Sequence, residues 1–376
     1  MTSFADRSVW DVAIIGAGPG GSLLSLILAR SGLSVILLDQ SEFPRRKVCG
    51  GCLNGNAMAA LKACGLANLP QRLGAKSVAR MRMCWGGRWA ELPFENNWSI
   101  SRTVFDTALI DQAQAAGVTF ASGQRGTLGP VAGNFRQVEV QSKVSSSVLS
   151  AKIAIVAHGL KAGTIARNSR LGAGTILPEV PACLTDDGLL MVIGRGGYVG
   201  GVSVENNQYD LAAALDVNFL KARGSIANAV NDLFRQAGYQ PMPEVANADW
   251  KGTPLLTRRP KQIAGERWFA VGDAAGYVEP FTGEGMAWAM NGALALAPIV
   301  QQSVAQWQPR VVDNWSKVYQ QKIARRQWPC RVFAKVLRSP TLSLGLVSGL
   351  RLCPSVARPI LQHLSRPTAC PEGMIV

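Results

Sequence analysis

The sequence lacks any apolar run of the roughly 18 residues that would span a bilayer. Its first apolar stretch carries glycines and Pro19 where a signal peptide would have an unbroken core. The eight cysteines lack the dense, regular spacing of a secreted disulfide scaffold. We therefore expect a cytoplasmic protein with free thiols. Internal repeats and low-complexity tracts are also missing, which argues against solenoid and disordered classes.

Acidic residues are scarce as well. The chain has 39 Lys and Arg against 24 Asp and Glu, a net charge of +15. From residue 310 to 376 eleven basic residues stand against two acids, so this segment supplies +9. The excess favours an anionic partner, such as a membrane surface or a phosphorylated or carrier-bound substrate. We expect no nucleic acid partner, because zinc-finger spacing, RNA-binding strand motifs and basic–aromatic platforms are absent.

The N-terminal segment has the pattern of a βαβ unit. Residues 9–15 form a β-rich apolar stretch, residues 16–21 a glycine turn, residues 22–30 an apolar helix and residues 35–38 a second buried strand. Further along, residues 103–116 predict a helix and residues 153–157 another buried strand.

Between residues 176 and 259 the pattern changes to short, glycine-rich alternating stretches, typical of an antiparallel layer that carries a substrate pocket. The strand-like 268–271 and the apolar helix 285–296 then return the chain to the first domain. We predict an α/β protein with a discontinuous nucleotide-binding domain (1–75, 101–175 and 260–305). A β-rich substrate domain (76–100 and 176–259) and a helical C-terminal region (306–376) complete it.

The turn Gly16-Ala17-Gly18-Pro19-Gly20-Gly21 fits the dinucleotide motif G-x-G-x-x-G in its strand–turn–helix context. Gly16 permits the tight turn, Gly18 lets the backbone approach a pyrophosphate, and Gly21 lets helix and strand pack closely. Asp39 closes the second strand, where an acid binds an adenosine ribose hydroxyl. The alternative is a glycine turn in an unrelated α/β protein.

Gly272-Asp273, at the end of the strand-like 268–271, decides between NAD and FAD. A carboxylate there lies beside the ribityl chain of FAD, a feature that a nicotinamide site does not need. Asp273 as an ordinary helix cap is the alternative. FAD is the cofactor we predict, and we expect no metal, because Cys49-Gly50-Gly51-Cys52 has no second cysteine pair or histidine cluster.

Together these segments resemble the FAD-dependent oxidoreductases of the aromatic-hydroxylase (glutathione-reductase-like FAD) fold, and within it the geranylgeranyl reductases. The matching segments are the glycine motif, Gly272-Asp273 running into Pro280-Phe281-Thr282-Gly283-Glu284-Gly285, and Lys47-Val48-Cys49-Gly50-Gly51. Arg102, ahead of Phe105-Asp106 and a helix, resembles the family's flavin-contacting arginine. The resemblance covers most of residues 9–300.

The resemblance implies roles for several residues. Pro280, Gly283 and Gly285 would lie under the flavin ring, where the following helix N-terminus stabilises negative charge on reduced flavin. A plain glycine-rich loop is the alternative. Cys49 would lie near flavin and substrate and either help deliver a proton or only fill space. His158 stands where the family has Asp, and we expect it to be a structural replacement.

The expected function is an NAD(P)H-driven FAD enzyme that reduces C=C bonds in an apolar, isoprenoid or lipid-like substrate. NAD(P)H would visit transiently, because the chain has no second glycine motif in strand–helix context. The alternatives are a monooxygenase, a halogenase and a non-catalytic flavin-binding module. The family's Trp-x-Phe-Pro stretch is missing, so the substrate need not be a geranylgeranyl chain, and the halogenase signature Trp-x-Trp-x-Ile-Pro is missing too.

The C-terminal region predicts attachment to an anionic membrane surface through residues 311–376. Trp315, Tyr319 and Ile323 recur at helical spacing and share one face, with basic residues around them. Residues 342–352 add an apolar stretch able to lie in a bilayer interface, flanked by arginines that include Arg358. The alternative is that these helices pack on the FAD domain and expose a solvated basic face.

Overall fold

The first sheet of the protein is built around parallel strands and begins at the N-terminus, as the βαβ pattern predicts. The computed structural model describes residues 9–161, 163–184, 188–279, 281, 283–357, 359 and 361. The parallel strands of the first sheet, in spatial order, are β18 (Trp268–Ala270), β9 (Ser146–Val156), β1 (Val9–Ile15), β2 (Val35–Leu38) and β6 (Thr119–Ala121). A short strand, β17 (Ala264–Gly265), runs antiparallel beside β18.

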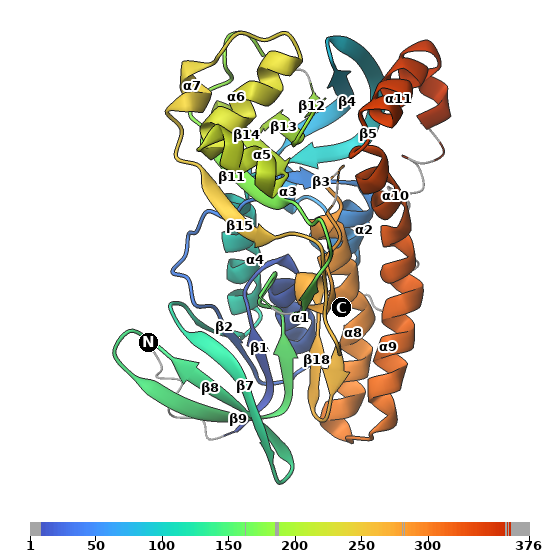
Figure 1. Ribbon diagram of the computed structural model, residues 1–376. Coiled ribbons are helices and arrows are strands. Elements are labelled where there is room, and N and C mark those ends of the chain that lie inside the picture. The colour runs from blue at the N-terminus through green and yellow to red at the C-terminus, as the bar shows by residue number, and fades with distance from the viewer. Residues whose placement is uncertain are drawn as a thin grey trace.

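The two faces of the first sheet are covered differently. Val12 and Ile14 of β1 face a core formed with α1 (Pro19–Arg30), α4 (Arg102–Ala115) and α8 (Gly285–Ala305). Ala13 and Ile15 face the opposite way, toward β7 (Arg125–Ala132) and β8 (Phe135–Gln141). Figure 1 shows this sheet in the lower half of the molecule, with the β7–β8 ribbon extending from it.

Helix α1 begins at Pro19, three residues earlier than the glycine pattern predicts. Proline suits the first helical turn because its missing N–H would have no partner there. Gly20 and Gly21 are buried in that turn, so half of the glycine motif belongs to the helix. The helix N-terminus is thereby placed at the carboxyl end of β1.

The second sheet lies above the first in Figure 1. Its strands, in spatial order, are β15 (Lys251–Leu255), β11 (Leu171–Leu177), β14 (Tyr209–Leu215), β13 (Gly197–Ser203), β12 (Leu189–Gly194), β4 (Lys76–Trp85), β5 (Arg88–Ser99) and β3 (Cys52–Leu53). All neighbours pair antiparallel except β12 and β4, which are parallel. The expected antiparallel layer is therefore present, and β3 and the β4–β5 hairpin, from residues 52–99, extend it.

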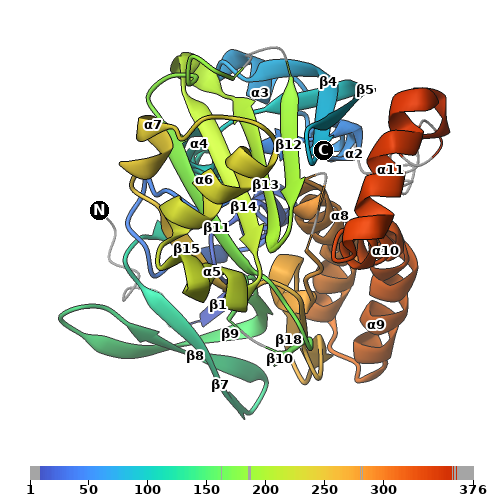
Figure 2. The ribbon, with the colours of Figure 1, turned by 45° about the horizontal axis from the view of Figure 1, so that its top comes forward.

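Helices also cover the outer face of the second sheet, which the alternating pattern of residues 176–259 does not predict. They are α5 (Val217–Arg223), α6 (Ile226–Gln236) and α7 (Pro243–Ala246), and Figure 2 shows α6 lying across the strands. Val230, Leu233 and Phe234 of α6 are buried against that face. The other face of the sheet is turned toward the first sheet and the C-terminal helices.

The C-terminal helices are α9 (Arg310–Lys322), α10 (Trp328–Val336) and α11 (Pro340–Leu352), joined by η4 (Ala324–Gln327) and followed by η5 (Pro354–Ala357). Trp315, Tyr319 and Ile323 do share one face, but that face is buried. The indole N–H of Trp315 donates to the carbonyl of Ala270 in β18 at 3.1 Å. This apolar face is therefore used for packing on the core of the first sheet, and the interpretation of it as a membrane-facing surface is wrong.

The remaining elements are short: α2 (Gly55–Ala63), α3 (Leu69–Arg72), η2 (Glu205–Asn207), η3 (Gly272–Ala275), and the two-stranded sheet of β10 (Thr164–Ile165) and β16 (Arg258–Arg259). Within the described part of the chain, no helix is both long and apolar enough to cross a membrane. Arg358 lies outside the described residues.

Candidate cofactor and substrate site

The glycine turn after β1 forms a cradle with two kinds of glycine. Gly16 has φ of +113°, and a Cβ on Gly21 would lie 2.0 Å from the carbonyl oxygen of Gly16. Both positions therefore need glycine for the fold itself. Gly18 differs: its backbone is extended (φ −79°, ψ 179°), and the nearest atom to a Cβ would be Nη2 of Arg102 at 3.7 Å. The open space beside Gly18 faces the cavity at the N-terminus of α1.

Asp39 lies at the end of β2 and holds this cradle together. Its Oδ2 accepts a hydrogen bond from the backbone N–H of Ala17 at 2.9 Å, and its Oδ1 accepts from Ser41 N–H at 2.8 Å. The residue is buried, yet it lines the cavity. A carboxylate has several lone pairs, so it can accept a further hydrogen bond from a hydroxyl group on the cavity side. Its position therefore suits a ribose hydroxyl, as the motif predicts.

Positive charge gathers on the opposite side of the cradle. Arg102, at the start of α4, donates through Nε and Nη2 to the two carboxylate oxygens of Asp106, both at 2.7 Å. Arg45 reaches the same carboxylate at 3.2 Å. Burial acts to lower the pKa of Arg102, but the Asp106 ion pair outweighs it and raises that pKa, so Arg102 stays charged. Two arginines share one carboxylate, and the excess positive charge next to Gly18 suits a pyrophosphate.

Asp273 follows β18 in η3, and Gly272 before it has φ of +64°. Burial raises the pKa of Asp273, while nearby Lys47 and Arg102 oppose the shift. Lys47 is half-buried, and desolvation lowers its pKa, with Arg102 acting in the same direction. The backbone of η3 thus brings a carboxyl group to the cavity beside Lys47, a residue of the matching Cys-Gly-Gly segment to which the sequence analysis gave no role of its own.

The loop between η3 and α8 approaches the cavity closely. Gly283 has φ of +82°, and a Cβ there would lie 2.7 Å from Cβ of Cys52. Gly285 begins α8, next to the ring of Tyr277. Both glycines line the cavity with the helix N-terminus behind them. Pro280 lies outside the described residues.

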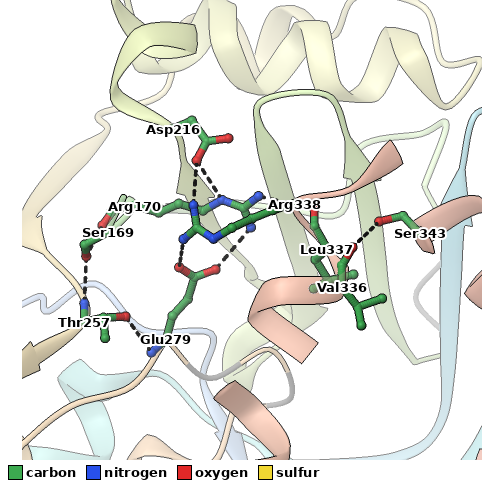
Figure 3. Close-up of polar contacts among 9 residues, drawn as sticks. All are labelled: Ser169, Arg170, Asp216, Thr257, Glu279, Val336, Leu337, Arg338 and Ser343. Atoms are coloured by element: carbon green, nitrogen blue, oxygen red, sulfur yellow. Dashed lines mark hydrogen bonds and ion pairs between the residues drawn. The ribbon is translucent and has the colours of Figure 1, made fainter. Parts of the chain in front are cut away.

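A buried ion cluster anchors the start of this loop (Figure 3). Arg170 is 1% exposed and pairs with Glu279 at 3.2 Å and with Asp216 at 3.1 Å. Its Nη2 also donates to the carbonyl of Leu337 at the end of α10, and Arg338 reaches Asp216 at 3.4 Å. The cluster joins the second sheet, the loop that leads to Gly283 and the C-terminal helices.

The cradle and the loop open into one cavity of about 540 Å³ that extends to the second sheet. Its far wall is largely apolar and includes Leu189, Met191, Tyr198, Leu256 and Phe281. Tyr198 and Phe281 pack edge to face, with ring centroids 5.2 Å apart. One end of the cavity therefore suits a charged dinucleotide and the other an apolar molecule.

Cys49 and Cys52 both line this cavity. Burial raises the pKa of the Cys49 thiol, although Arg102 opposes the shift. Burial also raises the pKa of Cys52, whose Sγ–H donates to the carbonyl of Gly50 at 3.1 Å. Both are free thiols in the structure. The arrangement suits proton donation by Cys49 and does not suit a nucleophilic thiolate.

His158 lies at the carboxyl end of β9 and lines the cavity. Its Nδ1 is 3.4 Å from the carbonyl oxygen of Gly159, and burial lowers its pKa. The imidazole is therefore neutral and turned to its own backbone, an arrangement that suits the structural role expected of it.

The cavity also contains a side chain that the motifs do not indicate. Asp210 of β14 is buried and lines the cavity. A single acid in the apolar strand Tyr209–Leu215 is the sequence feature that points to it. Arg45 and Lys47 were missed for another reason, because only the folded chain brings them to Asp106 and Asp273.

The residues of the cradle fit FAD. Its pyrophosphate is suited by a helix N-terminus without a side-chain cap, by a cluster of arginines, and by Gly18, beside which only the Arg102 side chain lies close. Asp39 suits the ribose, and Asp273 with the Gly283–Gly285 loop suits the ribityl and ring end. Each of the described motif residues, from Gly16 to Gly285, lines one cavity or supports its wall.

Comparison with known proteins supports this assignment. The sequence profile described as FAD binding domain matches residues 9–162. Conditioned medium factor receptor 1 of Dictyostelium discoideum is 25% identical over 343 residues, which cover 80% of this chain and 65% of that protein. Menaquinone reductase of Mycobacterium tuberculosis is 24% identical over 354 residues, which cover 84% of this chain and 82% of that protein.

Among solved structures, a flavoprotein/dehydrogenase from Cytophaga hutchinsonii matches with a TM-score of 0.81 and 17% identity, covering 95% of this chain and 92% of that one. Residues 9–162 are thus an FAD-binding domain, in the fold that flavoprotein monooxygenases and halogenases share. By its fold and by this domain, the chain resembles FAD-dependent oxidoreductases. The chain spans 65% of the length of the Dictyostelium relative, so its particular reaction is a matter for proposal.

Proposed function

We propose that the protein uses FAD and NAD(P)H to reduce a C=C bond in an apolar substrate. One observation carries the proposal: a single cavity joins the phosphate cradle to the apolar wall of the second sheet. An apolar molecule in that end would lie beside the Gly283–Gly285 loop, where the reactive ring of the cofactor is expected. When bound, FAD supplies two-electron chemistry, including hydride transfer.

The protein's own residues would bind, orient and protonate. Gly18, Asp39 and Arg102 would hold the dinucleotide, and Asp273 would hold the ribityl chain. Leu189, Met191 and Phe281 would exclude water from the substrate. Cys49 keeps its proton because burial raises its pKa, so it can donate to a substrate carbon.

The similarity to a menaquinone reductase supports reduction of an apolar compound. The resemblance of the Cys-Gly-Gly and Pro-x-x-Gly-x-Gly segments to geranylgeranyl reductases supports C=C reduction. The alternative is a monooxygenase that hydroxylates an aromatic or lipid-like substrate, because the fold is shared with p-nitrophenol 4-monooxygenase from Pseudomonas putida.

Substrate-dependent oxidation of NAD(P)H under nitrogen tests the proposal. The purified holoenzyme would be given isoprenoid and quinone lipids in turn, and the rate compared with that of the enzyme alone. We expect at least one lipid to raise the rate without oxygen. A lipid that stimulates oxidation only in air supports the monooxygenase, and no stimulation by any lipid contradicts both.

We further propose that α10 and α11 attach the enzyme to an anionic membrane, which would dissolve such a substrate. Trp328, Leu342 and Leu352 are 65%, 57% and 86% exposed, an unusual gathering of apolar side chains on two consecutive helices. Arg325 and Arg351 lie exposed on the same region. Apolar side chains flanked by arginines favour an interface with anionic headgroups.

A further inference from the structure

Asp210 is the one acidic residue on β14, and it lines the cavity. Asp210, Ala212 and Ala214 alternate along the strand and line the cavity. Leu211 and Leu215 point the other way, into the core beneath α6. The strand therefore buries its apolar residues on one side and presents a carboxyl group on the other.

In the part of the chain that the structure describes, the carboxyl group of Asp210 has no hydrogen bond or ion pair. The residue is nevertheless only 5% exposed. Its carboxyl oxygens border the cavity and are not enclosed in the packed core, so a molecule in the cavity can reach them. Because the group lines the cavity, a bound molecule is the partner that it lacks.

The charged neighbours of Asp210 are all engaged elsewhere. Arg46 pairs with Asp249 at 3.1 Å. Arg102 is held by both oxygens of Asp106. Glu205 accepts a hydrogen bond from the backbone N–H that precedes Arg102, at 2.9 Å. The neighbouring thiols Cys49 and Cys52 are neutral, since burial raises their pKa values.

The Cys49-Gly50-Gly51 segment lies directly against this strand. A Cβ on Gly50 would lie 3.8 Å from Cβ of Ala212, and a Cβ on Gly51 would lie 3.2 Å from Oδ2 of Asp210. Gly51 also has φ of +62°. The two glycines thus let the Cys49 segment approach β14, and they place a thiol and a carboxyl group at the same end of the cavity.

We propose that Asp210 is a catalytic residue that donates a hydrogen bond to a carbonyl oxygen of the substrate, so that the substrate is an apolar molecule whose C=C bond is conjugated with a carbonyl group. This inference rests on the proposed function and specifies its substrate class. A pure hydrocarbon would leave Asp210 buried and unpaired in the complex as well. A carbonyl oxygen provides the acceptor that a protonated carboxyl group needs.

The carboxyl group can act as a donor only if it keeps its proton. Burial raises the pKa of Asp210 well above its usual range, and Glu205 raises it further, while Arg46 and Arg102 oppose the shift. Buried carboxyl groups in apolar sites do remain neutral at pH 7 and then serve as hydrogen-bond donors.

The reaction balances with one NAD(P)H and one proton per C=C bond. The π bond breaks as the β-carbon accepts a hydride, and the electron pair moves to the carbonyl oxygen, which takes the proton of Asp210 to give an enol. The α-carbon then takes a proton from solvent by way of the Cys49 thiol. The enol oxygen returns its proton to Asp210, and the carbonyl group re-forms.

Binding of two matched probes tests the inference without turnover. Farnesal carries an aldehyde conjugated with a C=C bond, and farnesene is a hydrocarbon of the same chain length. Affinity for the oxidised holoenzyme would be measured by perturbation of the flavin spectrum. We expect the wild-type protein to prefer farnesal by roughly tenfold, as one added hydrogen bond implies. Asp210→Ala should lose the preference, and Asp210→Asn, which retains an N–H donor, should keep part of it.

The pH profile of farnesal reduction gives a second measurement. The active form carries the proton on Asp210, so kcat/KM should be constant at low pH and fall as pH rises through the raised pKa. Asp210→Asn should lack this fall and be at least about 100-fold slower, as expected for loss of a general acid. Asp313→Asn, which removes an exposed acid on α9, should match wild type.

Reduction of the bound flavin by NAD(P)H without substrate separates the two hypotheses, because Asp210 has no part in that step. One outcome is that NAD(P)H reduces the flavin of the wild-type protein while the protein binds farnesal no more tightly than farnesene. That result overturns the inference about Asp210 and leaves the proposed C=C reduction untouched. Asp210→Ala that keeps the wild-type farnesal preference overturns it as well. Wild type that prefers farnesal but does not reduce it supports Asp210 as the carbonyl-binding group and contradicts the proposed reductase.

Discussion

Gly18 and Gly21 belong to one motif, but the structure predicts different consequences for their replacement. A methyl group on Gly21 would lie 2.0 Å from a backbone oxygen of Gly16, so the helix or the strand must move. Such overpacking costs typically about 1–3 kcal/mol of stability and sometimes more. A methyl group on Gly18 meets only Arg102 Nη2, at 3.7 Å, so Gly18→Ala should fold normally. It would instead occupy the space that we assign to the pyrophosphate.

The size of the expected stability difference follows from the thermodynamic linkage between FAD binding and folding. At an FAD concentration 100 times its Kd, binding stabilises the wild-type fold by about 2.7 kcal/mol, whereas a variant that binds 100-fold more weakly gains only about 0.4 kcal/mol. The assay is thermal or urea unfolding of apoprotein with and without FAD, together with the flavin content of purified protein.

We expect Gly18→Ala to match the wild-type apoprotein in stability, to gain little from FAD and to purify colourless. Gly21→Ala should be unstable even as apoprotein. Gly345→Ala in α11, where a Cβ meets nothing within 4 Å, is the matched control and should behave as wild type in both assays. A yellow Gly18→Ala protein with full flavin content would refute the assignment of the cradle.

Three further predictions concern the rest of the site. Cys49→Ala should slow turnover by at least about tenfold, because it removes a proton donor. Cys52→Ala should keep the wild-type rate. Equal rates for Cys49→Ala and wild type would remove Cys49 from the site. Arg170→Met should cost about 3–5 kcal/mol in urea unfolding because it leaves the buried Glu279 with only the longer contact to Arg338, at 3.7 Å. The more exposed Arg338→Met should cost about 1 kcal/mol or less. The wild-type protein should co-sediment with anionic liposomes, less so as salt is added, and Leu352→Glu should not co-sediment. Equal amounts of wild-type protein pelleted with neutral and with anionic liposomes would contradict attachment to an anionic membrane.

Local sequence was enough to predict much of the cofactor half of the site. The bounds of β1 and β2 and the place of Asp39 follow from apolar strands around a glycine turn, and each of these features depends on near neighbours. Asp273 could be predicted because its strand returns to the same sheet. In this half, the backbone geometry at each position requires a particular type of residue, so the geometry can be inferred from the sequence.

The substrate half could not be predicted in the same way. Arg170 meets Glu279 across 109 residues, and no local pattern joins them. The face of Trp315 and Tyr319 illustrates a second limit, because amphipathicity shows that a helix buries one side but not against what. Asp210 illustrates a third: an acid in an apolar strand is visible in the sequence, but only the fold shows that it is unpaired and turned into the cavity.

The mass of the product formed under nitrogen tests the central claim most directly. The holoenzyme would be incubated with NADPH and a lipid that stimulates its oxidation, and the product analysed by mass spectrometry with and without oxygen. The account predicts a product two hydrogens heavier than the substrate, formed equally well without oxygen. A product one oxygen heavier, formed only in air, would contradict it.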